Sequence, residues 1–250
     1  MRVIDLFSGI GGFSLGLERA GMSTVAFCEV DKTCHRVLKK HFPTVPIHDD
    51  VRNFTGVEAE VVCGGFPCQD ISIAGRQAGI QEGTRSGLWS EFKRIISEVK
   101  PKYAIIENVE RLRARGLVRV LNDLREVGYD AEWHTIPASA LGAPHKRERI
   151  WIIAYPSGYT SGRVLDSKDV VPCDGQWEYA ENIRSWHGWQ YWLAKDVFDG
   201  NRVEDAPRED RVDDGLPSRV DRVRQLGNSV VPQIPELIGR AIMAKEASYL

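Results

Sequence analysis

Short apolar segments alternate with segments of helical periodicity through the first 155 residues, and this alternation limits the folds open to the chain. We expect strands at 3–6, 24–28, near 47, 61–63 and 103–106. Apolar residues at helical spacing separate them at 13–20, 32–41, 88–99 and 117–127. Strands that alternate with helices form a mostly parallel sheet covered on both faces. The sequence therefore predicts an α/β fold.

The chain changes character after this region. Segments 129–136 and 150–155 predict two paired edge strands, and periodicity then fades from about 156 to 215, where tryptophan and tyrosine crowd among polar residues. We interpret this stretch as a compact insertion with a small aromatic core. A helical stripe returns at 235–247 and should pack on the sheet.

Three parts of the chain follow from these patterns. We expect a catalytic and cofactor-binding α/β domain at 1–155, a small insertion at 156–215, and a C-terminal segment at 216–250 that returns to the first domain.

Composition excludes several classes of protein. Of the 250 residues, 42% are hydrophobic and 27% charged, as in soluble domains. No apolar run approaches the roughly 20 residues that cross a bilayer, and Asp5 and nearby glycines interrupt any signal-peptide core. Five cysteines without paired spacing predict a reducing compartment, the cytoplasm, and no metal site. A net charge of −2 disfavours nonspecific coating of nucleic acid but leaves local contact open.

Polar or glycine-rich segments follow five of the predicted strands. In a parallel sheet, ligands bind outside the carboxyl ends of the strands. These ends supply the turn 7–12 after Asp5, then Glu29, Asp50, the turn 66–69, and Glu107 with Asn108. We therefore expect all five to meet at one edge of the sheet.

The first of these turns indicates a nucleotide-containing cofactor. Gly9-Ile10-Gly11-Gly12 allows close approach of backbone to a ligand, and Glu29 follows at the distance typical of a carboxylate that binds ribose hydroxyls. Ser14 stands where a dinucleotide fingerprint has glycine or alanine, which disfavours a pyrophosphate. S-adenosylmethionine, which holds adenosine without phosphate, fits better, with Asp50 and Val30 near the adenine.

Cys68 lies on the Gly/Pro-rich turn 64–69, directly after the apolar run 61–63. A nucleophilic cysteine must be reachable and able to ionise, whereas Cys63 inside the apolar run has the character of a packing residue. On this feature alone, an ordinary Pro-Cys loop remains an alternative.

Five motifs resemble those of the DNA (cytosine-5) methyltransferases and occur in that family's order. Asp5 to Phe13 is similar to the first cofactor motif, and Gly64 to Gln69 to the nucleophile motif. The remaining three are Glu107-Asn108-Val109, Arg147-x-Arg149 and Gly227-Asn228-Ser229-Val230-Val231-Pro232. The resemblance spans most of the chain and implies a compact bacterial or phage enzyme of restriction-modification type, with a Rossmann-like methyltransferase fold.

The resemblance also implies a reaction. Cys68 would add to C6 of a cytosine, Glu107 would stabilise charge at N3, and Arg147 and Arg149 would hold the base edge and the surroundings of the cysteine. S-adenosylmethionine would then methylate C5. The implied cofactor contacts come from Phe7, Gly9, Gly11, Glu29, Val30, Asp50, Pro67 and Asn228.

The implied partner is double-stranded DNA, bound by a monomer, with a cognate restriction endonuclease acting on the same site. A base inside a duplex must be flipped out of the stack before it can react. The glycine-rich loop 70–87 is suited to close over it. Candidate DNA contacts are Ser72, Arg76 and Arg85 in this loop, and Arg184 and Gln190 in the insertion.

Departures from the family pattern keep alternatives open. His145 stands where the paired-arginine motif usually begins with glutamine, and the next-to-last motif is reduced to 211–222. An RNA cytosine-5 methyltransferase is one alternative, although the Cys-Phe-Thr signature of that branch is absent. A catalytically silent DNA-binding module is disfavoured by intact Cys68 and Glu107. A nicotinamide oxidoreductase is disfavoured by Ser14.

Overall fold

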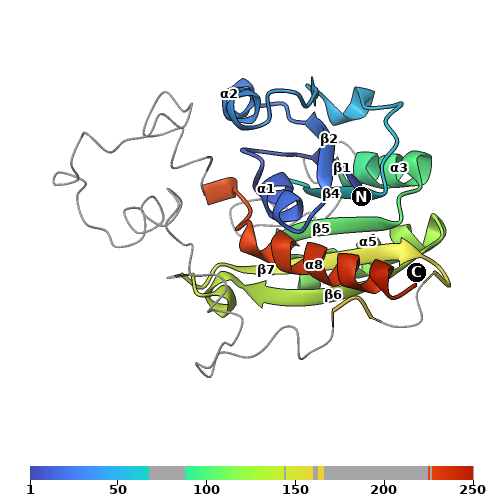
Figure 1. Cartoon of the computed structure of the whole chain (residues 1–250). Coiled ribbons are helices and arrows are strands. Elements are labelled where there is room, and N and C mark those ends of the chain that lie inside the picture. The colour runs from blue at the N-terminus through green and yellow to red at the C-terminus, as the bar shows by residue number, and fades with distance from the viewer. Residues whose placement is uncertain (68–87, 144, 160–162, 166–224, 226, 250) are drawn as a thin grey trace.

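A computed structural model describes residues 1–67, 88–143, 145–159, 163–165, 225 and 227–249 (Figure 1). Cys68, the loop 70–87 and nearly all of the predicted insertion lie outside the described residues. The division at 155 and 215 therefore stays a prediction.

A seven-stranded sheet forms the centre of the described fold, in the order β3-β2-β1-β4-β5-β7-β6. β1 to β5 run parallel to one another, and β7 is antiparallel to both β5 and β6. The mostly parallel sheet predicted from the sequence is confirmed. The strands are β1 (Arg2–Leu6), β2 (Ser23–Cys28), β3 (Ile47–His48), β4 (Val61–Gly65), β5 (Tyr103–Val109), β6 (Tyr129–Pro137) and β7 (Glu148–Pro156).

Helices cover both faces of this sheet. Alternate strand residues point to opposite sides, so Val3 belongs to one hydrophobic cluster with α1 and α8, whereas Ile4 belongs to a second cluster with α3 and α5. The helices are α1 (Gly12–Arg19), α2 (Lys32–His41), α3 (Trp89–Val99), α4 (Leu112–Arg115), α5 (Leu117–Glu126) and α8 (Gln233–Ala247), with short 3-10 helices η1 (Val51–Asn53) and η3 (Ala138–Leu141).

The strand at 103–106 and the edge pair differ from the sequence-based predictions. β5 continues to Val109, so Glu107 and Asn108 lie inside the strand and not beyond its end. β7 lies between β5 and β6, which leaves β6 alone at the edge. The prediction that 150–155 forms an edge strand is therefore wrong. The order of the strands along the chain does not reveal that the later strand, β7, lies inside the sheet next to β5.

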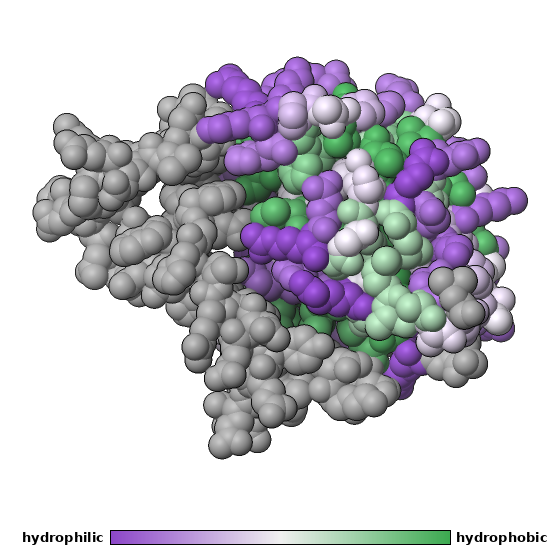
Figure 2. Space-filling model, viewed as in Figure 1, coloured by the Kyte–Doolittle hydropathy of each residue, from purple (hydrophilic) through white to green (hydrophobic). Residues whose placement is uncertain are grey.

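α8, from the C-terminal part of the chain, packs beside α1, from its N-terminal part (Figure 1). A Cβ atom on Gly16 would lie 2.2 Å from the carbonyl oxygen of Pro232 and 2.7 Å from Cγ of Pro235. A Cβ on Gly12 would lie 2.6 Å from the carbonyl oxygen of Val230. The returning segment thus contacts α1 backbone to backbone, which only glycine permits at these positions. Figure 2 shows the same face, with hydrophilic residues over much of its rim and a paler hydrophobic area toward its middle.

Gly16→Ala should lower the free energy of unfolding by about 3 kcal/mol, because the new methyl group would overlap backbone that cannot move away cheaply. Urea denaturation measures the change. Gly227→Ala is the matched control, since a Cβ there meets no atom within 4 Å in the part of the chain that the structure describes. A loss below about 0.5 kcal/mol for Gly16→Ala would show that the close approach does not constrain the fold.

Candidate active site

The turn after β1 places backbone N–H groups beside Glu29. Gly9 has φ +53° and Gly11 φ +86°, conformations that favour glycine. The N–H of Gly9 donates to Oε2 of Glu29 at 2.7 Å, and the N–H of Asp31 donates to Oε1 at 2.7 Å. Each carboxylate oxygen keeps one further acceptor position. Glu29 is therefore fixed in place and can still accept hydrogen bonds from a ligand.

Other residues that the sequence predicts as cofactor contacts lie next to Glu29 in the sequence or in the turn after β1. Val30 is 73% exposed, an unusual position for a large apolar side chain, and it directly follows Glu29. Phe7, in the turn, packs partly buried against Phe92, with ring centroids 6.3 Å apart, and has φ +54°. A Cβ on Gly9 would meet no atom of the described residues within 4 Å. Among these residues, the turn therefore borders open space at the sheet edge.

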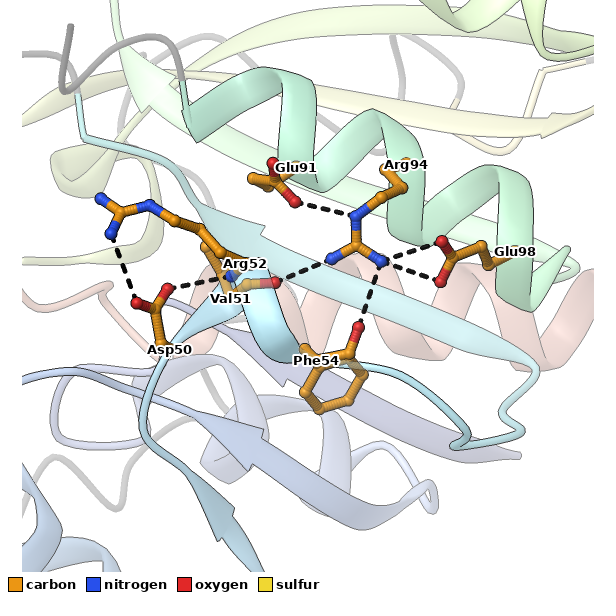
Figure 3. A network of polar contacts seen from close by, with 7 residues as sticks. All are labelled: Asp50, Val51, Arg52, Phe54, Glu91, Arg94 and Glu98. Atoms are coloured by element: carbon orange, nitrogen blue, oxygen red, sulfur yellow. Dashed lines mark hydrogen bonds and ion pairs between the residues drawn. The ribbon is translucent and has the colours of Figure 1, made fainter. Parts of the chain in front are cut away.

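Asp50 begins η1, and Arg94 of α3 holds this short helix in place (Figure 3). The guanidinium of Arg94 donates to the carbonyl oxygens of Val51 at 2.9 Å and Phe54 at 3.2 Å. It also pairs with Glu91 and Glu98 of its own helix. Asp50 itself accepts from the N–H of Arg52 at 2.9 Å. The sequence analysis did not identify Arg94. Its role depends on contacts with residues about forty positions away in the chain, such as its hydrogen bond to Phe54.

A partly buried ion pair lies on the other half of the site. Nε of Arg149 on β7 is 3.0 Å from Oε1 of Glu107 on β5. A Cβ on Gly65 would lie 2.8 Å from Oε2 of Glu107, so the glycine makes room for this carboxylate against β4. Burial raises the pKa of Glu107, and Arg149 and then Arg147 oppose part of that rise. The carboxyl group therefore holds its proton to a higher pH than an exposed glutamate.

Arg147 binds the last sequence motif. Its Nη1 donates to the carbonyl oxygen of Gly227 at 2.8 Å, and its Nη2 to that of Ser229 at 2.7 Å. Burial, and then repulsion from Arg149, lower the pKa of Arg147 to about 10, so it stays charged at neutral pH. Asn228 lies between the two carbonyls and is exposed. The paired-arginine motif and the last motif are thus one unit in space.

Asn108 fixes the turn that leads to position 68. It is buried, and its Nδ2 donates to the carbonyl oxygen of Phe66 at 3.1 Å. Its Oδ1 accepts from the N–H of Val109 at 2.9 Å. The sequence analysis assigns no role in the site to Asn108. Its position next to Glu107 in the Glu-Asn-Val motif could have identified it. Pro67 is the last described residue before the gap.

Asp5 is a buried carboxyl group that sequence reasoning placed at the same edge. It accepts from Oγ of Ser14 at 2.8 Å and from the N–H of Ser14 at 3.2 Å, while its Oδ1 contacts no hydrogen-bond partner among the described residues. Burial raises the pKa of Asp5 to about 8; the Ser14 bonds oppose this rise and the charge of Glu29 adds to it. The side chain is therefore mostly neutral at pH 7.

Two groups of predicted residues have different outcomes. One group consists of Gly9, Gly11 and Glu29. A second group consists of Glu107, Arg147 and Arg149, with Asn228 in the segment that Arg147 binds. The same segment contacts Gly12, next to the first group. Outside the described residues lie Cys68, Ser72, Arg76, Arg85, Arg184 and Gln190.

His145 precedes Arg147 in the position where the family pattern has glutamine. Burial, and then the charge of Arg147, lower the pKa of His145, so its imidazole is neutral at pH 7. Among the described residues, no group of three histidine, cysteine or acidic side chains is arranged to hold a metal ion. In the same part of the chain, no helix has the length and apolar character needed to span a membrane.

The fold and these motifs define a class of protein. The family model described as C-5 cytosine-specific DNA methylase matches residues 1–205. The chain belongs to this family, and its Rossmann-like sheet is the fold expected of an S-adenosylmethionine-dependent methyltransferase.

Particular relatives are similar to this chain. Type II methyltransferase M2.BsuMI of Bacillus subtilis (strain 168) is 39% identical over 180 residues, which cover 68% of this chain and 44% of that protein. Type II methyltransferase M.HhaI of Haemophilus parahaemolyticus is 37% identical over 161 residues, 62% of this chain and 49% of that protein. The chain thus spans about half the length of these relatives.

A solved structure supports the fold over nearly the whole chain. The Dnmt2 methyltransferase of S. pombe aligns with a TM-score of 0.65 and 15% identity, covering 98% of this chain and 99% of that one. At this identity, the similarity shows a shared fold.

Asp5→Asn should change how stability depends on pH. The folded-state pKa of about 8 exceeds the unfolded value of about 3.9. The carboxyl group therefore stabilises the fold fully below about pH 4 and loses that contribution as the pH rises to about 8. Relative to Asp5→Asn, the wild-type free energy of unfolding should fall by up to about 1.4 kcal/mol per pH unit across this range and level off above it.

Urea denaturation of both proteins from pH 5 to pH 9 measures this difference. A difference that stays constant over the range would contradict a neutral, buried Asp5.

Proposed function

We propose that this chain is a DNA (cytosine-5) methyltransferase that transfers a methyl group from S-adenosylmethionine to C5 of a flipped cytosine. The observation that carries the proposal is the partly buried pair of Glu107 and Arg149, together with the turn held by Asn108, which precedes Cys68 in the sequence. A carboxyl group with a raised pKa and a thiol nucleophile are the two groups that this chemistry requires.

The described residues fit S-adenosylmethionine. Glu29 has two free acceptor positions for ribose hydroxyls, Val30 offers an uncovered apolar surface, and the space beside Gly9 is open. Asp50 on its fixed turn would contact the adenine side. We further propose Phe7, Gly11, Pro67 and Asn228 as cofactor contacts. When bound, the cofactor supplies an electrophilic methyl group on a sulfonium.

Cytosine C5 is a weak nucleophile, and the protein has to activate it. The Cys68 thiolate would form a bond to C6 of the ring, and the electron pair would move toward N3. Glu107, whose pKa is raised by burial and lowered in part by Arg149 and then Arg147, would donate a proton to N3 and neutralise the developing charge. C5 would then carry enamine character and be able to accept the methyl group that the cofactor supplies. Loss of the C5 proton to a base, departure of Cys68 as the thiolate and return of the N3 proton to Glu107 would restore the aromatic ring.

Arg149 and Arg147 have different roles in this proposal. Arg149 orients Glu107 through the 3.0 Å contact and leaves further guanidinium donors for the base edge. Arg147 binds the carbonyl oxygens of Gly227 and Ser229, and we propose that its positive charge favours the thiolate of Cys68.

We propose double-stranded DNA as the substrate, with Ser72, Arg76, Arg85, Arg184 and Gln190 as DNA contacts. The relatives' printed description as Type II methyltransferases supports a role in restriction-modification, with a cognate endonuclease. A cytoplasmic monomer fits this role. The assignment of 1–155 to catalysis, 156–215 to target recognition and 216–250 to the returning segment completes the proposal.

A duplex containing 5-fluorocytosine should trap the protein covalently when S-adenosylmethionine is present, because fluorine at C5 cannot leave as a proton. A denaturing gel over a library of duplexes detects the adduct. Cys68→Ser should abolish it, whereas Cys63→Ala, which changes a buried thiol on β4, should retain it.

Two outcomes would overturn parts of this assignment. Adduct formation by Cys68→Ser would remove the proposed nucleophile. Trapping on single-stranded RNA carrying the same base, and on no duplex, would show that the substrate is RNA.

Glu107→Gln should lower kcat by about 100-fold or more, because an amide cannot deliver the proton to N3. The dissociation constant for S-adenosylmethionine should change less than about twofold, since Glu107 lies on the base side of the site. Methyl incorporation and calorimetric titration measure the two quantities. Glu126→Gln, on the exposed face of α5, is the control. A loss in kcat below about tenfold would exclude Glu107 as the proton donor.

A further inference from the structure

The returning segment is hydrogen-bonded to the N-terminus of α2 at one buried side chain. Gln225 is 5% exposed, and its Nε2 donates to Oδ2 of Asp31 at 2.7 Å. Without this partner the buried amide would destabilise the fold, because nothing would offset its loss of hydration. The contact joins positions far apart in the chain and fixes where the segment enters the fold.

Asp31 connects Gln225 to the proposed ribose-binding carboxylate. Its Oδ1 accepts from the N–H of Thr33 at 2.9 Å and thereby caps α2. Its own N–H donates to Oε1 of Glu29 at 2.7 Å, and Oε2 of Glu29 accepts from Gly9 at 2.7 Å. A continuous chain of hydrogen bonds therefore runs from Gln225 to the glycine turn after β1.

We propose that Gln225 is a positioning residue that couples cofactor binding to the placement of the returning segment. Gln225 holds Asp31, Asp31 holds the carboxylate of Glu29, and Glu29 meets the ribose; this last step rests on the proposed function. Coupling between two sites is reciprocal, so bound cofactor stabilises the Gln225 contact as much as that contact stabilises the cofactor.

The same segment continues to the base side of the site. Only a few residues beyond Gln225, the carbonyl oxygens of Gly227 and Ser229 accept from Arg147, whose charge lies near Glu107 and Arg149. Filling the adenosine side thus favours the arrangement of the segment that Arg147 requires. The cofactor organises the base side before DNA arrives.

Gln225→Ala should weaken the binding of S-adenosylhomocysteine about tenfold, as measured by calorimetric titration, with the fold intact by circular dichroism. Lys245→Ala is the matched control. Lys245 donates to the carbonyl oxygen of Arg163 at 3.0 Å, so this variant removes a long-range tether that is remote from Glu29. Its affinity should stay within about twofold of wild type.

A second variant separates positioning from a general loss of packing. Asp31→Ser keeps an N-cap oxygen for α2 but is too short to reach Gln225. It should show the same loss of affinity, and adding Gln225→Ala to it should cause little further change, because both substitutions break one contact. It also provides the test if Gln225→Ala does not fold.

Amide hydrogen exchange supplies a readout that does not depend on activity. Adding S-adenosylhomocysteine should slow exchange at 227–231 in the wild type and leave it unchanged in Gln225→Ala. If the wild-type protein binds no S-adenosylhomocysteine, the proposed function fails. If it binds, and Gln225→Ala matches it in affinity and in exchange, the proposed function stands and the coupling is wrong.

Discussion

Backbone contact between α1 and the returning segment is the constraint on which the site depends. Gly12 and Gly16 face the carbonyl oxygens of Val230 and Pro232 at distances that a Cβ atom would not tolerate. This approach sets the depth at which residues 227–232 lie over the first glycine turn, and therefore where their carbonyl oxygens meet Arg147. Stability and site geometry depend on the same close contact.

Electrostatics in the site reflect a balance between burial and pairing. Burial raises the pKa of Glu107 and lowers that of Arg147, which disfavours the charged form of both. Each side chain nevertheless has a specific partner, Arg149 for the carboxylate and two backbone carbonyls for the guanidinium. Removing one partner would leave a partly buried charge uncompensated, which costs more than the pair itself contributes. Each of the two groups is therefore held by a specific contact.

Local patterns predicted the elements well, and long-range placement could not be predicted. Helical spacing located α2 at Lys32–His41 with both bounds correct, because its apolar and charged positions alternate clearly. The polar residues Glu107 and Asn108 hid the last part of β5, since they are buried by pairing and not by hydrophobicity. The bond of Arg147 to Gly227 joins residues 80 positions apart, and no periodicity records it.

The returning segment contacts both the cofactor side and the base side of the proposed site. These contacts explain why the two sides take part in one proposed mechanism. Gln225 reaches the cofactor side through Asp31, and Gly227 and Ser229 reach the base side through Arg147. Arg147 binds the main-chain carbonyl groups of Gly227 and Ser229, so the side chains at these two positions can vary while the backbone path cannot. That path is fixed by the glycines of α1. A shift of the segment by a fraction of an ångström would therefore disturb the Glu29 and Glu107 sides together, and the two sides must be assembled as one unit.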